Sequence, residues 1–183
     1  CRCPTVVPTA GLLVERRSQI SLPTHQNRSV PNFPELVAHL RRQPYGDRLK
    51  VVDFGDLPLC DQFCATASAQ VLVAQHGAGL SNAAFLQERS AVVEITPKKM
   101  WSRSIYHCLA GTRDVHYDPV PQNDMHDPVD VVAVHTAVQI ALDKVRTHVP
   151  SDARYPKPGG HHLKVCDKTN PDWEAPVDCG YGR

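Results

Sequence analysis

A glycine-flanked turn between a strand and a helix is the feature of this sequence best suited to chemistry. The apolar residues 71–74 run almost directly into the segment His76-Gly77-Ala78-Gly79-Leu80. Glycine permits positive φ angles and a close approach of the backbone to a ligand, and the first N–H groups of a following helix have no intrahelical partner. Such a turn is suited to anions, above all phosphates. The alternative is a tight crossover in which His76 only caps the neighbouring backbone.

The sequence lacks three motifs that would identify the phosphate ligand differently. A dinucleotide fingerprint needs a third glycine where this chain has Asn82, although Glu94 stands near the end of the next predicted strand, where an acid could bind a ribose. The chain contains neither the Gly-x-Ser-x-Gly elbow of hydrolases nor the Gly-x-x-x-x-Gly-Lys phosphate loop. These absences favour a nucleotide-sugar site.

The elements that must position this turn alternate between strands and helices. Proline is absent from residues 59–96 and 129–149, so we expect the regular core in these two windows. The apolar patterns predict strands near residues 12–14, 49–54, 71–74, 91–95 and 113–117, and helices near 32–40, 59–69, 80–86, 101–110 and from 127 onward. This alternation predicts an α/β fold, a Rossmann-like parallel sheet with helices on both faces.

Two of these helices carry start signals in the sequence. Asn32 is expected to cap the helix that begins near residue 33, with Glu35 completing a capping box. The dipeptide Asp127-Pro128 is expected to open the last helix, as a cap followed by proline in the first turn.

Length and charge limit the class of protein. The chain has 183 residues, and its 20 Lys and Arg against 19 Asp and Glu give a net charge of +1, which predicts no nucleic-acid partner. No apolar run reaches the roughly 20 residues needed to cross a bilayer, so a membrane anchor, if any, is expected upstream. We expect residues 1–10 to be a linker from a missing upstream half, residues 11–149 the Rossmann-like domain, and residues 150–183 a tail rich in Pro, Gly and His.

The turn and its surroundings resemble glycosyltransferase family 61. Residues 76–82 (HGAGLSN) and 92–97 (VVEITP) are similar to the signature block of that family, and residues 28–36 are similar to its upstream Arg-x-x-Asn-x-x-Glu-Leu stretch, with one extra residue. The resemblance covers about residues 11–97. It implies a GT-B architecture of two Rossmann-like halves, of which this chain is the C-terminal half. Ser81 and residues 87–90 depart from the family pattern and leave the substrate open.

The resemblance also implies an activity and roles for the turn. The reaction would move a sugar from a nucleotide-sugar, a UDP-sugar, to a protein or polysaccharide hydroxyl, without a cofactor. The departing diphosphate gains negative charge, which N–H groups of Gly77, Ala78 and Gly79 and a ring N–H of His76 would stabilise. His76 is also a candidate catalytic base, since histidine titrates near neutral pH; a base from the other half is the alternative.

Arginines near the strand ends complete the expected site. Arg16 and Arg17 follow the first predicted strand and Arg28 lies in the next loop, and each guanidinium could contact phosphate in a bidentate manner or remain a solvated surface charge. Glu94 would bind ribose or satisfy the backbone at its strand end. The residues expected to bind the nucleotide-sugar are His76, Gly77, Ala78, Gly79, Leu80, Asn82, Arg16, Arg17, Arg28 and Glu94.

Two other functions remain open on the sequence alone. The chain could be a non-catalytic Rossmann-like module that binds a nucleotide or serves as a scaffold. It could also bind an NAD-type dinucleotide through Gly77, Gly79 and Glu94. No metal is expected because the chain has no Asp-x-Asp motif, although His161, His162 and Cys166 form a weaker metal-binding candidate.

The seven cysteines and one sequon favour the lumen of the Golgi or endoplasmic reticulum. Asn27 begins an Asn-x-Ser glycosylation sequon. Cys166 and Cys179 form the expected disulfide, because a bridge there would hold a tail that has no core. Cys60 and Cys64 share one face of a predicted helix, where we expect them to pack as small apolar side chains.

Overall fold

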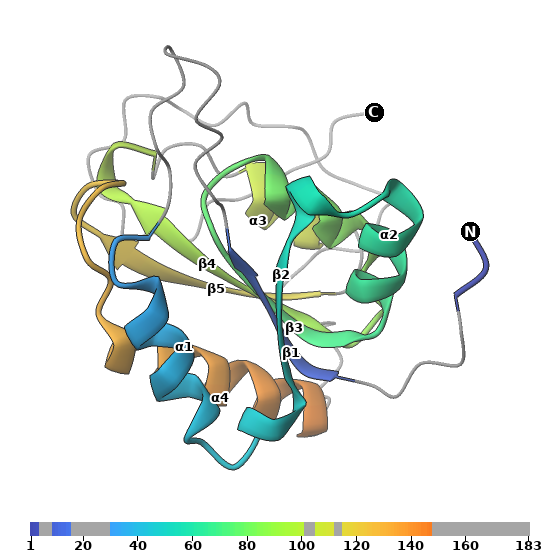
Figure 1. The fold of residues 1–183 in the computed structure, drawn as a ribbon, viewed down its shortest axis with the longest axis horizontal. Coiled ribbons are helices and arrows are strands. Elements are labelled where there is room, and N and C mark those ends of the chain that lie inside the picture. Colours follow the sequence, from blue (N-terminus) through green and yellow to red (C-terminus); the bar gives the residue numbers. More distant parts are fainter. Residues whose placement is uncertain (4–8, 16–29, 101–104, 112–114, 148–183) are drawn as a thin grey trace, which may run out of the picture.

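A five-stranded parallel sheet forms the centre of the computed structural model, which describes residues 1–3, 9–15, 30–100, 105–111 and 115–147. Its strands are β1 (Thr9–Glu15), β2 (Leu49–Asp53), β3 (Ala69–Gln75), β4 (Ala91–Pro97) and β5 (His116–Gln122). They lie in the order β2-β1-β3-β4-β5, and all neighbours are parallel (Figure 1). The predicted α/β, Rossmann-like fold is confirmed.

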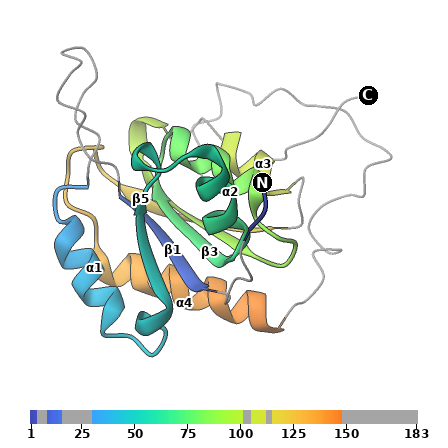
Figure 2. The same ribbon diagram turned by 45° about the vertical axis from the view of Figure 1, so that its right-hand side comes forward.

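Helices cover both faces of the sheet. The helices α1 (Phe33–Arg41) and α4 (Val131–Thr147) lie on one face, and α2 (Leu59–Ala67), α3 (Ile105–Gly111) and the 3₁₀ helix η3 (Ala78–Phe85) lie on the other (Figures 1 and 2). Every residue of β4 is buried. Burial on both faces explains why the central strands read as nearly continuous apolar runs.

The direction of the chain across the sheet reverses between β1 and β3. From β1 the chain passes through α1 to β2 on one side, and from β3 it continues through β4 to β5 on the other side. In open parallel sheets, ligands bind outside the carboxyl ends of the strands at such a switch point. Because β3 ends at Gln75, the turn that begins at His76 lies at this edge of the sheet.

Asn32 stands at the start of α1, but its side chain makes no capping hydrogen bond, so the predicted capping box is wrong. Instead, Asn32 Oδ1 accepts from the Val129 N–H at 2.9 Å and Asn32 Nδ2 donates to the Val129 carbonyl at 3.0 Å. The Glu35 carboxylate accepts a longer bond from Asn32 Nδ2, at 3.3 Å. Asn32 therefore ties the start of α1 to the segment before α4.

The last helix begins later than predicted. Its first residue is Val131, and Asp130 rather than Asp127 caps it. Asp130 Oδ1 accepts from the N–H groups of Val132 at 2.9 Å and Ala133 at 3.0 Å. Asp130 is the N-cap because the oxygen of a capping side chain must reach the second or third N–H group of the helix, and these belong to Val132 and Ala133.

The last strand also differs from its predicted bounds, since β5 extends to Gln122 rather than ending near residue 117. Pro119 and Pro121 lie within it and are exposed. Proline is tolerated there because β5 is an edge strand with a neighbour on one side only.

Cys60 and Cys64 form disulfides, so the prediction that they pack as free apolar side chains is wrong. The bridges are Cys1–Cys60 and Cys3–Cys64, with Cα–Cα distances of 5.2 and 5.3 Å. Two residues of extended chain advance about 6.8 Å and four residues of helix about 6 Å, so the two spacings match each other. The other expected bridge, Cys166 with Cys179, lies outside the described residues.

These disulfides fit a protein of the secretory pathway, because such bridges persist in oxidising compartments. Among the helices that the structure describes, none combines the length and the apolar character that crossing a bilayer requires.

Removing the two disulfides should not have additive effects on stability. The bridges join residues 59 and 61 positions apart and therefore close nearly the same loop. Loss of one bridge, through Cys1→Ser with Cys60→Ser, should lower the free energy of unfolding by less than about 2 kcal/mol, and loss of both by about 4 kcal/mol, since the remaining bridge restricts the same unfolded chain. Urea unfolding of the single and double removals measures both values. If the stability lost on removing both bridges equals the sum of the two single losses, the shared-loop explanation is contradicted.

A pair of histidines connects α1 to α4. His39 Nε2 and His135 Nδ1 lie 3.3 Å apart, and their ring centroids lie 5.2 Å apart. A hydrogen bond between two imidazoles needs one bare nitrogen. Burial, together with the charge of His39, lowers the pKa of His135 below its ordinary value.

The stability of the fold should fall as the pH drops below about 6.5, the ordinary pKa of histidine. In that range the unfolded chain takes up protons that His135 and the half-buried His107 resist, because both have lowered pKa values in the folded chain. Replacing His135→Gln should flatten the decline, whereas the exposed control His126→Gln should leave it unchanged. Urea unfolding at about pH 7.5 and about pH 5.5 tests this. An equal decline in wild type and His135→Gln would contradict it.

Candidate functional site

The turn after β3 has a backbone conformation that favours glycine. Gly77 adopts φ 153° and ψ −177°, a region populated almost only by glycine. The His76 N–H donates to the Ile95 carbonyl at 2.9 Å, and the Leu80 N–H donates to the Gly77 carbonyl at 3.0 Å. These two bonds fix the turn at both of its ends.

The helix that follows is a 3₁₀ helix that begins at Ala78, two residues earlier than the predicted helix over 80–86. In a helix of this type the first N–H groups lack partners within the helix. No described residue accepts a hydrogen bond from the backbone N–H of Gly77, Ala78 or Gly79. The turn therefore has three backbone N–H groups without an acceptor among the described residues, of which Ala78 is exposed to solvent, Gly79 half-buried and Gly77 buried.

Asn82 and Gln62 hold the turn against the loop that follows β2. Asn82 Nδ2 donates to the Gly79 carbonyl at 3.2 Å and lies 3.4 Å from Gln62 Oε1. Gln62 Nε2 in turn donates to the carbonyls of Phe54 and Leu57, both at 2.9 Å. These bonds give Asn82, which we predicted to contact the nucleotide, a supporting position in the fold. Leu80 is fully buried.

Gly79 places the turn directly over the switch point of the sheet. A Cβ atom built on Gly79 would lie 3.6 Å from Val14 Cγ1 on β1 and 3.7 Å from Phe54 Cδ2, which follows β2. The turn from β3 therefore reaches across the carboxyl ends of β1 and β2. This is the position at which parallel sheets of this topology bind phosphate-containing ligands.

Next to the turn, the buried His76 and Glu94 and the half-buried Tyr117 form a hydrogen-bonded chain that we name the His76–Glu94–Tyr117 network. His76 Nδ1 lies 2.5 Å from Glu94 Oε1, and the Tyr117 hydroxyl donates to Glu94 Oε2 at 2.7 Å. The His76 and Glu94 side chains are only 8% and 2% exposed. Glu94 lies on β4 and Tyr117 on β5, so the network crosses neighbouring strands and ends at the turn.

Two residues of α3 cover this network. The Tyr106 ring packs edge-on against the His76 ring, with centroids 5.3 Å apart, and the His107 ring lies 5.0 Å from the Tyr117 ring. Burial raises the pKa of the Tyr117 hydroxyl, as do the charge of Glu94 and the hydrogen bond to it. Burial lowers the pKa of His107, and the negative charge of Glu94 opposes that shift. Tyr117 is therefore a neutral donor to Glu94.

The structure gives Glu94 an environment that differs from the predicted ribose contact. Both carboxylate oxygens have partners inside the protein, and the residue is 1% exposed. The signal in the sequence is a single acid within the apolar run VVEI, because a buried carboxylate must be paired or hydrogen-bonded. Sequence reasoning missed Tyr117, which pairs with Val92 and shares the face of Glu94 only because of the register between β4 and β5.

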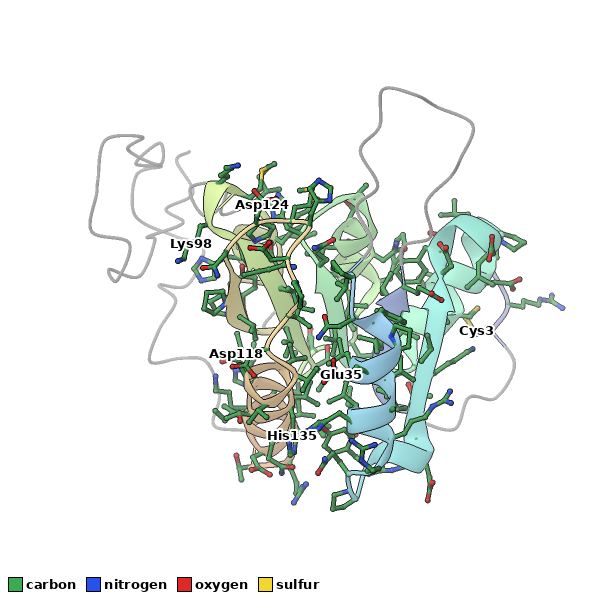
Figure 3. The ribbon with its side chains drawn as sticks, turned by 60° about the vertical axis from the view of Figure 1, so that its left-hand side comes forward. Cys3, Glu35, Lys98, Asp118, Asp124 and His135 are labelled. Carbon is green, nitrogen blue, oxygen red and sulfur yellow. A yellow bond between two sulfur atoms is a disulfide. The ribbon has the colours of Figure 1, made fainter. Side chains whose placement is uncertain are left out.

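Lysines that sequence reasoning missed lie at the same edge of the sheet. Lys98 and Lys99 directly follow β4, and Lys99 Nζ pairs with Asp124 Oδ2 at 2.9 Å. Lys98 and Asp124 lie at the end of the molecule opposite to His135 (Figure 3). The sequence feature that could have identified these lysines as site residues is their position directly after a predicted strand.

Several predicted site residues lie outside the described part of the chain. These are Arg16, Arg17, Arg28, Asn27, Cys166, Cys179, His161 and His162. Their roles stay predictions. In the described ranges, no three or more His, Cys, Asp or Glu side chains are grouped so that they could hold a metal ion.

A cavity of about 560 Å³ lies elsewhere, at the amino ends of β3 and β4. The Cys3–Cys64 disulfide, Phe63 and Gln70 line it together with Arg89 and Ser90. Because the turn at His76 lies at the carboxyl ends of the same strands, this cavity is a separate feature.

The two glycines of the turn should respond differently to alanine. Gly77→Ala should lower the free energy of unfolding by about 1–3 kcal/mol, because its backbone conformation is strained for any residue with a Cβ. Gly79→Ala is the matched control, because its Cβ would make ordinary van der Waals contacts, and its stability should stay within about 0.5 kcal/mol of wild type. Urea unfolding of both variants measures the difference. Equal losses would contradict the conformation described for Gly77.

Comparison with known proteins identifies the family of this chain. The family model described as Glycosyltransferase 61 matches residues 2–93, about half of the chain. The chain is also 31% identical over 103 residues to the EGF domain-specific O-linked N-acetylglucosamine transferase of Drosophila melanogaster. That alignment covers 56% of this chain and 19% of the relative, so the chain spans about a fifth of the relative's length. The matched residues include β1 to β3 and the turn at His76, and the chain belongs to glycosyltransferase family 61.

Proposed function

We propose that this chain is the nucleotide-sugar-binding part of a glycosyltransferase that transfers a sugar from a UDP-sugar to a hydroxyl group of a protein or polysaccharide. Membership of family 61 supports the type of reaction. The observation that carries the proposal is the turn of Gly77, Ala78 and Gly79, whose backbone donors lie beside His76 at the switch point of a parallel sheet.

The geometry fits a diphosphate better than an uncharged ligand. Backbone N–H groups that have no acceptor in the described chain can donate to phosphate oxygens without reorganisation. We propose that a ring nitrogen of His76 adds a further donor beside these amides. When the bond between sugar and diphosphate breaks, the electron pair leaves with the diphosphate, and donors at this position stabilise the added negative charge.

The relative's name suggests a donor and an acceptor. It describes a transferase that is specific for EGF domains and that adds O-linked N-acetylglucosamine. We therefore propose UDP-N-acetylglucosamine as the first donor to test and a protein hydroxyl as the first acceptor. The two disulfides and the family together support a site of action in the lumen of the endoplasmic reticulum or Golgi.

In this proposal residues 11–149 form one half of a two-domain, GT-B enzyme. The catalytic base that deprotonates the acceptor is then His76 or a group of the other half, which would close over the same edge of the sheet. An NAD-type ligand is less favoured, because Asn82 replaces the third glycine and both oxygens of Glu94 are bonded inside the protein.

Calorimetric titration of the folded chain should detect binding of UDP and UDP-N-acetylglucosamine but not of NAD. His76→Ala should weaken UDP binding at least about tenfold, because a hydrogen bond to a charged group contributes about 1.5–3 kcal/mol. His135→Ala is the matched control, since His135 lies at the end of the molecule opposite to Lys98 and Asp124, and it should bind like wild type (Figure 3). Circular dichroism checks that each variant is folded.

Two results would overturn this proposal. One is a folded wild-type chain that binds no UDP or UDP-sugar at millimolar concentration. The other is binding of NAD in preference to UDP, which would support the dinucleotide alternative. UDP binding without any sugar transfer, measured with the complete enzyme and a protein acceptor, would instead favour the non-catalytic module.

A further inference from the structure

We propose that Glu94 and Tyr117 are positioning residues that fix the tautomer of His76, so that Nε2 is the ring nitrogen that faces the diphosphate of the nucleotide-sugar. This inference rests on the proposed function, because it assumes that the turn at His76 holds that diphosphate. The part that concerns the tautomer depends only on the His76–Glu94–Tyr117 network.

The hydrogen bond between His76 and Glu94 has a defined direction. An ionised carboxylate can only accept hydrogen bonds, so the hydrogen between the two groups belongs to His76 Nδ1, which lies 2.5 Å from Glu94 Oε1. Nδ1 then carries a hydrogen whether the ring is neutral or protonated. Nε2 is the nitrogen at which a proton is gained or lost.

Tyr117 forms the other hydrogen bond to Glu94. Its hydroxyl donates to Glu94 Oε2 at 2.7 Å, so each carboxylate oxygen has its own donor. Because burial and the charge of Glu94 raise the pKa of Tyr117, the hydroxyl keeps its hydrogen and can only be neutral here. Tyr117 therefore holds Glu94 in the rotamer that reaches His76, and it gives the second oxygen of this almost fully buried carboxylate a hydrogen-bond donor.

The orientation of the His76 ring is also defined. The His76 N–H is bonded to Ile95, Nδ1 is bonded to Glu94, and the Tyr106 ring packs edge-on at 5.3 Å, so backbone and side chain are both fixed. No described residue forms a hydrogen bond with Nε2. Gly77, with its donor N–H, follows His76 directly. Nε2 is thus the ring atom left for a ligand at the turn.

Glu94 acts here through His76 and does not contact the ligand. The arrangement of a carboxylate that orients a histidine through Nδ1 is used in hydrolytic triads and in metal sites, where it sets which nitrogen is reactive. In this chain it would present Nε2 to a phosphate oxygen as a donor when the ring is protonated. It also explains why an acid occupies the middle of a strand that is buried on both faces.

Nitrogen NMR of the full chain with ¹⁵N-labelled histidine tests the tautomer without any ligand. We expect His76 Nδ1 to bear a hydrogen in wild type, and the Nε2 signal to move when UDP is added while Nδ1 moves little. Glu94→Gln should introduce the opposite tautomer, since a carboxamide can donate to Nδ1, and should weaken UDP binding about tenfold. Tyr117→Phe, a milder change, should shift the tautomer ratio in the same direction.

Two variants serve as matched controls. Glu88→Gln removes the charge of an exposed acid, and Tyr45→Phe removes a buried hydroxyl that has no hydrogen-bond partner among the described residues. Both should keep the wild-type His76 signals and the wild-type affinity for UDP. A purely structural role for Glu94 would lower stability without changing the tautomer.

The outcomes separate this inference from the proposed function. A wild-type His76 with its hydrogen on Nε2 and a bare Nδ1 would overturn the positioning role, even if UDP binds. UDP binding that leaves the Nε2 signal unchanged would overturn the role of Nε2. If UDP does not bind at all, the proposed function fails and the role of Nε2 fails with it, whereas the expected tautomer in wild type and its loss in Glu94→Gln would still support the positioning of His76.

Discussion

A buried carboxylate sets the conditions that the rest of this site must meet. Glu94 lies in the middle of β4, a strand buried on both faces, where an ionised group without partners would strongly destabilise the fold. Its partners come from the residue after β3 and from β5, so the carboxylate connects three consecutive strands of the sheet. The same bonds that satisfy Glu94 also fix the ring that stands at the start of the glycine turn.

The topology of the sheet explains why this ring lies at a ligand site. From β1 the chain continues to β2 on one side of the sheet, and from β3 it continues to β4 on the other side, so the carboxyl ends of these two neighbouring strands form the switch point at which open parallel sheets bind ligands. Gly79 packs on Val14 and Phe54 across that point, and Asn82 with Gln62 ties the turn to the loop after β2. The donors of Gly77, Ala78 and Gly79 are therefore held by packing from β1 and β2 as well as by β3.

Local sequence patterns predicted most of the strands and helices. They did not predict which residues form hydrogen bonds or disulfides with one another across these elements. Apolar runs bounded by glycine and proline located β1 to β4, and the family block located the turn. The partners of Glu94 depend on strand register, since Tyr117 shares its face only because β5 pairs with β4 so that Pro119 lies opposite Glu94. The disulfide partners of Cys60 and Cys64 depend on the tertiary contact between residues 1–3 and α2. The Asn32 side chain likewise bonds to the distant backbone of Val129 and not to the N–H groups of its own helix.

We propose that the turn at residues 76–79 receives the diphosphate of the nucleotide-sugar. Mapping of backbone amide shifts by ¹H–¹⁵N NMR during addition of UDP tests it most directly. We expect the amide signals of Gly77, Ala78 and Gly79 to move most, with smaller shifts at Lys98 and Lys99. Shifts concentrated at the amino ends of the strands, around the cavity lined by Phe63 and Arg89, would contradict it.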